Sequence, residues 1–214
     1  GVVKAVGRDV SLFKVGDKVF YAGSIARPGA NSERHVVDER IVGHMPNSLS
    51  FADAAALPLT AITAWELLFE RLGIAQGKTD LHQRLLIVGA AGGVGSILTQ
   101  LARQLTGLKV IGSASRPETQ AWVRELGADV IVDHRQPLSE ALKQAGIDAV
   151  THVASLTQTD QHLAQLVEAL APQGKLALID DPKTLDIALL KRKSLSLHWE
   201  FMYTRSLFET PDMI

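Results

Sequence analysis

The glycine-rich stretch at residues 85–95 constrains the fold of this chain more than any other segment. It reads Leu-Leu-Ile-Val-Gly-Ala-Ala-Gly-Gly-Val-Gly, so four large apolar residues run directly into a glycine-rich turn. Apolar residues then recur at helical spacing from Val94 to Leu105. A strand, a glycine turn and a helix in this order can bind a diphosphate, because glycines let the backbone approach the anion and the helix N-terminus offers free N–H groups.

The glycine turn predicts a nucleotide ligand but does not fix its class. Gly92 and Gly95 match the later glycines of the fingerprint G-x-G-x-x-G, and Ala90 stands at the position of its first glycine. Turns of this kind also occur in other α/β proteins, including methyltransferases that bind a methyl-donor nucleoside. The class of nucleotide therefore has to be argued from other residues.

The chain has two parts with different patterns of predicted secondary structure. Residues 1–47 contain short predicted strands at 1–7, 17–21, 34–37 and 40–42, and from Ser50 a helical pattern begins. Five apolar runs then alternate with helical patterns: strands at 85–88, 109–114, 130–132, 149–154 and 176–179, and helices at 94–106, 117–126, 138–145, 158–171 and 184–191. An alternating run at 195–201 reads as a half-covered edge strand. This order predicts an α/β fold, a doubly wound parallel sheet of the Rossmann type.

Composition excludes several functions. The 214 residues carry a net charge of −1 with no basic block, and no apolar run is long enough to cross a membrane, so we expect neither a nucleic acid nor a membrane as partner. Cysteine is absent, which excludes thiolate catalysis and thiolate-bound zinc and fits a cytoplasmic location. The seven histidines are scattered without helical pair spacing, so no metal site is predicted.

The residues after the second predicted strand indicate the type of nucleotide. NAD-binding sites place an acidic residue about 20 positions past the last glycine, where it binds the ribose 2′-OH. Here that region reads Ser113-Ala114-Ser115-Arg116, without an acid. Hydroxyls and a guanidinium are suited to a 2′-phosphate, so NADP(H) is favoured over NAD(H). The missing acid also counts against the methyltransferase alternative, while a solvated Arg116 that merely precedes a helix remains the plainer interpretation.

With these residues in view, the chain resembles the medium-chain dehydrogenase/reductase superfamily, in particular the zinc-free quinone oxidoreductases and the zinc-type alcohol dehydrogenase-like proteins. The matching segments occur in family order: 1–7, 15–19, 54–58, 63–65, 89–95, 126–129 and 174–176. The resemblance implies a partial GroES-like all-β catalytic domain at 1–47, a Rossmann domain at 48–204 and the start of a return segment at 205–214. It also implies about 60 further residues before Gly1 and a similar tail after Ile214.

The resemblance also assigns roles to individual residues. Gly92, Gly93 and Gly95 would hold the diphosphate, with the amides of Val94 and Gly95 directed at it. The other expected cofactor contacts are Ser113, Ser115, Arg116 and His134 near the 2′-phosphate, and Thr63, Ala154, Ser155 and Ile179 near the nicotinamide. Zinc-dependent relatives carry a cysteine four residues before the threonine, and here that residue is Leu59.

The implied reaction is hydride transfer from NADPH to an acceptor that is already electrophilic, such as a quinone or an α,β-unsaturated carbonyl. Tyr21 is a weak candidate for donating a hydrogen bond to the carbonyl; a packing role for this strand residue is the alternative. The resemblance also implies a homodimer paired through the edge strand at 195–201. Two further functions stay open: an NADPH-binding sensor or interaction module without turnover, and a zinc alcohol dehydrogenase.

Overall fold

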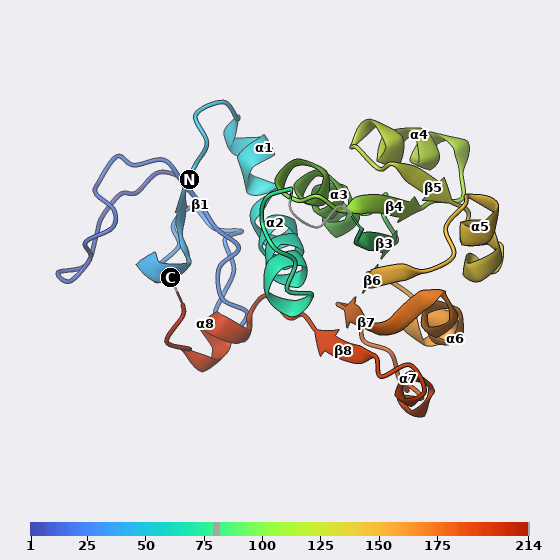
Figure 1. Ribbon diagram of the computed structural model, residues 1–214. Helices are drawn as coiled ribbons and strands as arrows, with labels where there is room; N and C mark the ends of the chain where they lie inside the picture. The colour runs from blue at the N-terminus through green and yellow to red at the C-terminus, as the bar shows by residue number, and fades with distance from the viewer. Residues whose placement is uncertain (79–81, 214) are drawn as a thin grey trace. The chain divides into compact units, whose positions relative to one another are not determined.

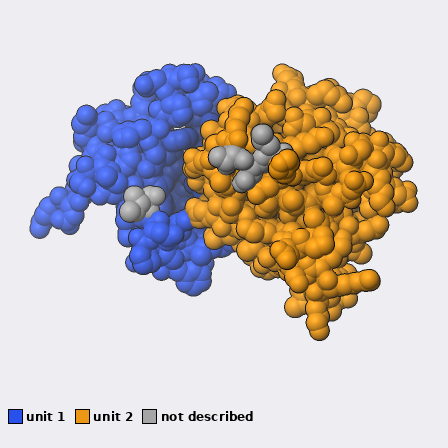
Figure 2. All heavy atoms as spheres, viewed as in Figure 1, with its two compact units in different colours: residues 1–62, 201–214 blue, residues 63–200 orange. Residues whose placement is uncertain are grey.

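A computed structural model describes residues 1–78 and 82–213 of the chain. The chain forms two compact units, coloured separately in Figure 2: Gly1–Ile62 with Phe201–Ile214, and Thr63–Glu200. Within the described ranges no helix is both long and apolar enough to cross a membrane.

The larger unit is built on a six-stranded sheet (Figure 1). Its strands are β3 (Arg84–Val88), β4 (Lys109–Ser113), β5 (Val130–Val132), β6 (Val150–Ser155), β7 (Leu170–Leu178) and β8 (Ser196–Trp199). Their order is β5-β4-β3-β6-β7-β8, and every neighbouring pair is parallel. The order reverses between β3 and β6, which is the doubly wound arrangement predicted from the sequence and is now confirmed.

Helices cover both faces of this sheet. They are α3 (Gly93–Leu105), α4 (Pro117–Glu125), α5 (Leu138–Gln144), α6 (Thr159–Ala169) and α7 (Ala188–Lys191), preceded by α2 (Pro58–Trp65) and a π-helix η2 (Glu66–Arg71). Alternate residues of β3 enter two different cores. Leu85 and Ile87 pack with α3 and η2, whereas Leu86 and Val88 pack with α5 and α6. Burial on both faces explains why this strand reads as a continuous apolar run.

Two predicted elements of the larger unit differ from the observed ones by several residues. β7 begins at Leu170, directly after α6, whereas the sequence pattern placed its start at residue 176. The helix predicted at 184–191 is confined to the short α7, because the preceding residues turn irregularly.

The smaller unit contains little regular structure. Its elements are β1 (Val19–Phe20), a 3-10 helix η1 (Glu39–Ile41), β2 (Gly43–His44), α1 (Phe51–Ala55) and α8 (Thr204–Phe208). β1 and β2 pair in antiparallel fashion, and α1 begins after the predicted cap Ser50, whose hydroxyl accepts from the Asp53 amide at 3.2 Å.

The predicted strands of the smaller unit are mostly wrong. Residues 34–37 are irregular, and of residues 1–7 only Val2 forms an isolated bridge, with Lys18. Residues 40–42 were predicted to be extended, but Asp38 accepts a hydrogen bond from the Arg40 amide and starts the 3-10 turn instead. A local side-chain bond of this kind competes with strand pairing.

Candidate functional site

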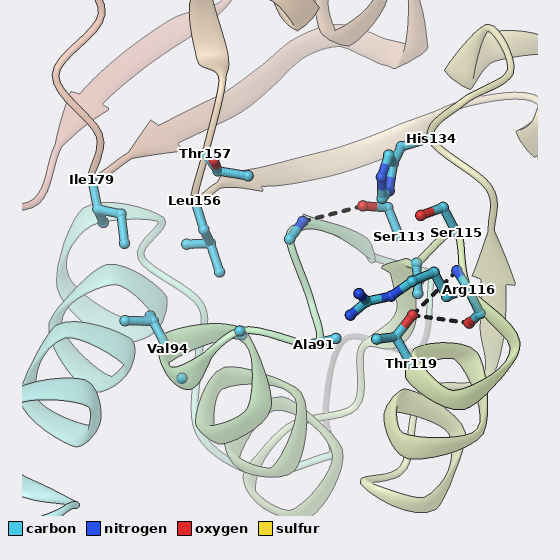
Figure 3. A pocket seen from close by; sticks show the side chains of 15 residues that line it. Ala91, Val94, Ser113, Ser115, Arg116, Thr119, His134, Leu156, Thr157 and Ile179 are labelled. Carbon is cyan, nitrogen blue, oxygen red and sulfur yellow. Dashed lines mark hydrogen bonds between the residues drawn. The ribbon is translucent and has the colours of Figure 1, made fainter.

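A pocket of about 590 Å³ lies in the larger unit at the carboxyl ends of the strands (Figure 3). Its floor is the glycine loop that joins β3 to α3, and its walls come from the segments that follow β4, β5, β6 and β7. The lining residues are Gly89, Ala91, Gly92, Gly93, Val94, Gly95, Ser113, Ala114, Ser115, Arg116, Thr119, His134, Leu156, Thr157 and Ile179. Parallel α/β sheets bind their ligands at this edge, near the strand where the order reverses.

The glycine loop has no room for a side chain at Gly95. A Cβ on Gly95 would lie 2.5 Å from the Gly89 carbonyl oxygen and 2.7 Å from Cα of Ala90. Gly89 itself has φ of +80°, a conformation that favours glycine. The loop leads into α3, whose N-cap residue Gly92 provides no side-chain cap, so the first N–H groups of this helix are left for another acceptor. Bare backbone beside an uncapped helix N-terminus suits a diphosphate.

The end of the pocket near β4 is polar. The Ser113 hydroxyl accepts a hydrogen bond of 3.1 Å from the Gly89 amide and ties the glycine loop to β4. Arg116 precedes α4, where Thr119 bonds its backbone at both the amide and the carbonyl, at 3.3 and 2.9 Å. The Arg116 side chain is 70% exposed and forms an ion pair of 3.0 Å with Glu118. A guanidinium is therefore available at the pocket rim, with a nearby carboxylate as its present partner.

The turn after β5 adds a second polar wall. His134 lines the pocket, and Figure 3 shows its ring beside Ser113 and Ser115. Its neighbours Asp133 and Arg135 form an ion pair of 2.6 Å. The hydrogen bonds from Arg135 lower the pKa of Asp133 to about 2, so this carboxylate is ionised at any ordinary pH.

The opposite end of the pocket is apolar. Val94, Leu156 and Ile179 lie together there, away from Arg116 and His134 (Figure 3). The Leu156 amide donates to the Val88 carbonyl at 3.2 Å and so continues the pairing of β6 with β3 beyond the strand end. An elongated ligand with one anionic and one flat, less polar end would fit these two halves.

Several predicted cofactor contacts do not line this pocket. Ala154 and Ser155 are fully buried in β6, where the Ser155 hydroxyl bonds that of Thr159 at 2.8 Å. Thr63 is 5% exposed in α2 and is likewise absent from the lining. Tyr21 belongs to the smaller unit, where its hydroxyl lies 3.1 Å from Nδ1 of His35 and burial raises its pKa.

Leu156 and Thr157 line the pocket and were missed from the sequence. The predicted strand ended at residue 154, whereas β6 ends at Ser155, and the pocket is lined by the two residues that follow. The rule that binding residues follow the carboxyl ends of parallel strands could have found them once that end was placed correctly. Three further lining residues were not predicted as contacts: Ala91 and Ala114 in the loops after β3 and β4, and Thr119 in the first turn of α4.

The described residues offer no donor set for zinc. No group of three or more His, Cys, Asp or Glu side chains within residues 1–78 and 82–213 could hold a metal ion. Leu59 stands where zinc-dependent relatives carry a cysteine ligand, and an aliphatic side chain cannot coordinate a metal. These residues therefore do not fit a catalytic zinc.

Comparisons with known proteins agree on one family. Residues 93–212 match the family model described as zinc-binding dehydrogenase. A zinc-type alcohol dehydrogenase-like protein of Staphylococcus aureus is 39% identical over 100% of this chain, which spans 64% of that relative's length.

Solved structures give the same picture. A protein from Rhizobium etli, provisionally named a zinc-dependent alcohol dehydrogenase, is 56% identical with a TM-score of 0.95; the match covers 100% of this chain and 62% of that one. The Escherichia coli quinone oxidoreductase complexed with NADPH is 27% identical with a TM-score of 0.82, over 100% of this chain and 64% of that one.

Proposed function

The chain belongs to the medium-chain dehydrogenase/reductase superfamily, within its zinc-binding dehydrogenase family, and from this premise we propose that its glycine-loop pocket binds NADP(H) for hydride transfer. The observation that carries the proposal is the pocket itself, which joins a cationic rim at Arg116, a bare glycine loop and an apolar end at Ile179. A dinucleotide needs these three environments in this order: a phosphate on its adenosine end, a central diphosphate and a flat nicotinamide.

Different residues of this chain would contact different parts of the cofactor. Gly92, Gly93 and Gly95 would let the diphosphate approach the loop backbone, and the amides of Val94 and Gly95 would donate to it. Val94, Leu156 and Ile179 would exclude water from the nicotinamide end. The lining residues would in turn be supported by three buried residues that do not reach the pocket, Thr63, Ala154 and Ser155.

The choice of NADP(H) rests on the polar end of the pocket. Ser113, Ser115 and Arg116 occupy the region where an acidic residue would bind a free ribose hydroxyl. A 2′-phosphate would draw the Arg116 guanidinium away from Glu118, since a doubly charged phosphate is the stronger acceptor. His134 would cover the same phosphate from the turn after β5.

We propose a quinone or an α,β-unsaturated carbonyl as the hydride acceptor of the whole protein. The nicotinamide supplies the hydride when bound, and the reduced acceptor takes up one proton. Such acceptors are electrophilic without a Lewis acid, which agrees with the missing zinc donors among the described residues. Tyr21 is the candidate for a hydrogen bond to the acceptor's carbonyl.

A zinc alcohol dehydrogenase is the second candidate, since the family is described as zinc-binding dehydrogenase and two similar proteins are named after zinc-type or zinc-dependent alcohol dehydrogenases. Zinc analysis of the full-length protein distinguishes a zinc alcohol dehydrogenase from a zinc-free reductase of quinones or enones. Stoichiometric zinc that is needed for alcohol oxidation would favour this candidate, and activity toward quinones or enones that survives a chelator would reject it.

We also propose that two copies pair along β8, which ends the strand order of the sheet. Trp199, in this strand, is 49% exposed. Sedimentation should show a dimer at micromolar concentration, and a monomer there would reject the pairing.

Parallel fluorescence titrations with NADPH and NADH test the cofactor proposal. We expect the chain to bind NADPH at least tenfold more tightly than NADH, and Arg116→Ala to abolish that difference, because it removes the guanidinium that a 2′-phosphate would bind. Arg124→Ala, an exposed arginine of α4, is the matched control. Failure of both nucleotides to bind would refute the proposal, and binding without turnover of any quinone or enone by the full-length protein would favour a sensor.

A further inference from the structure

The turn after β5 and the loop after β4 are joined by one arginine. Arg135 donates from Nη2 to the carbonyl oxygen of Ser115 at 2.9 Å. The same guanidinium is forked onto Asp133, with Nη2 at 2.6 Å from Oδ2 and Nε at 3.1 Å from both carboxylate oxygens. The Asp133 carboxylate also accepts from the Arg135 amide at 2.9 Å. We call this arrangement the Asp133–Arg135 clamp.

The clamp fixes a segment that the sheet leaves open. The ladder between β4 and β5 ends with the bond from the Ala114 amide to the Val132 carbonyl, at 3.0 Å. Beyond it, Ser115 is held through its carbonyl by Arg135, and Arg116 is held on its far side by Thr119. The two residues that reach the polar end of the pocket are therefore positioned from both directions. His134, between the two members of the clamp, is positioned by the same turn.

We propose that the Asp133–Arg135 clamp positions Ser115, Arg116 and His134 for the 2′-phosphate and so makes Arg135 a positioning residue for the choice of NADPH over NADH. This inference rests on the proposed function of the pocket. Neither member of the clamp lines the pocket, whereas the residues that they hold do. The clamp acts through the backbone of Ser115, so its effect is confined to the end of the pocket where the two nucleotides differ.

Positioning and simple charge attraction predict opposite results for Asp133. Removing this carboxylate takes one negative charge away from the phosphate end, so Coulomb attraction alone would tighten NADPH binding. Positioning predicts weaker NADPH binding, because Arg135 loses the fork that holds it against Ser115. Arg135→Lys also distinguishes positioning from charge attraction. Lysine keeps the positive charge but cannot bond the Ser115 carbonyl and the Asp133 carboxylate at once.

The chain contains a matched control. Asp38 and Arg40 form the same fork at the same spacing, with the Arg40 amide and Nε at 2.9 and 3.1 Å from Oδ1, and Nη2 at 2.7 Å from Oδ2. This pair belongs to the smaller unit, whereas the pocket is lined by residues of the larger one. Asp38→Ala and Arg40→Ala thus remove an equivalent ion pair without altering the Asp133–Arg135 clamp.

The experiment compares dissociation constants for NADPH and NADH in the wild type, Asp133→Ala, Arg135→Ala, Arg135→Lys and the two controls. We expect all three clamp variants to bind NADPH about tenfold more weakly, the scale of one lost hydrogen bond, with NADH changed less than twofold and the controls unchanged. Asp133→Asn, which keeps the side-chain shape, serves if the alanine variant does not fold in a thermal scan.

Several results would overturn the inference. Tighter NADPH binding by the Asp133 variants, or full retention by Arg135→Lys, would show that charge alone acts. An unchanged ratio of the NADPH and NADH dissociation constants in all clamp variants would show that the clamp only stabilises the turn after β5 and has no part in cofactor preference. A wild-type chain that binds neither nucleotide would overturn the proposed function and this inference with it, whereas wild-type preference for NADPH with unaffected variants would overturn the inference alone.

Discussion

Replacing Glu200 by glutamine tests a buried acidic cluster in the larger unit. The Glu200 side chain is 0% exposed, and its Oε2 accepts a hydrogen bond of 2.7 Å from Nε of Arg71. Glu66, also buried, lies 3.8 Å from the same guanidinium. Burial first, and then the neighbouring Glu66, raises the pKa of Glu200 to about 8 against the opposing charge of Arg71.

The raised pKa makes the free energy of unfolding depend on pH. The folded chain keeps a proton on Glu200 that the unfolded chain releases near the ordinary pKa of 4.5, so this contribution to stability is complete below that value and is lost as the pH rises through about 8. At ~1.4 kcal/mol per pH unit, a rise from pH 5 to pH 9 would cost at most about 4 kcal/mol. Because relaxation of the surrounding protein and water penetration reduce the burial penalty that raises this pKa, we expect roughly half, about 2 kcal/mol.

Urea unfolding at pH 5 and pH 9 measures this loss, and tryptophan fluorescence reports it, since Trp65 and Trp199 directly precede Glu66 and Glu200. The wild type should lose about 2 kcal/mol more than Glu200→Gln over this range, because the amide does not titrate. Glu125→Gln, on the exposed face of α4, should follow the wild type. Equal losses in the wild type and Glu200→Gln would refute the reasoning.

Three further results are expected. Gly95→Ala should abolish NADPH binding and lower the free energy of unfolding by about 2 kcal/mol, because its Cβ would lie 2.5 Å from a backbone oxygen, whereas Gly29→Ala, with nothing within 4 Å, should change neither titration nor urea midpoint. Thr159→Val should cost about 2 kcal/mol in urea unfolding, since it leaves the Asp180 carboxylate without the hydroxyl that it accepts from; an unchanged midpoint would contradict this. NADPH at a hundredfold excess over its dissociation constant should stabilise the wild type by about 2.7 kcal/mol in the same assay, and Arg116→Ala should need more NADPH for the same effect.

The sheet of the larger unit could be predicted because each strand carries its own signal. β3 is buried on both faces, so its apolar run is continuous, and the glycine loop marks where it ends. The smaller unit gave no such signal. Its strands β1 and β2 have two residues each, and alternation over four or five residues does not say whether a partner strand is present to pair with.

The candidate site was predictable to the extent that it follows strand ends. Ser115 and Arg116 directly follow the predicted strand at 109–114, and the glycine loop is marked by its own composition, whereas His134 was expected only from the family resemblance. Leu156 and Thr157 were missed by an error of one residue in the end of β6. The Asp133–Arg135 clamp could not be found from the sequence, because its bond to Ser115 joins residues 20 positions apart through a backbone carbonyl, which has no sequence signature.

The division of the pocket explains where cofactor choice can be altered. The glycine loop would contact only the diphosphate, which NADH and NADPH share, so changes there should weaken both nucleotides alike. The residues near β4 and β5 would meet the one group that differs, and they are held by bonds that need no ligand: Ser113 to Gly89, Thr119 to Arg116 and Arg135 to Ser115. A conversion to NADH therefore requires more than an acid in place of Ser115. With the clamp intact, the backbone stays arranged for a phosphate, so we expect the acid to weaken NADPH without tightening NADH until Arg135 is also replaced.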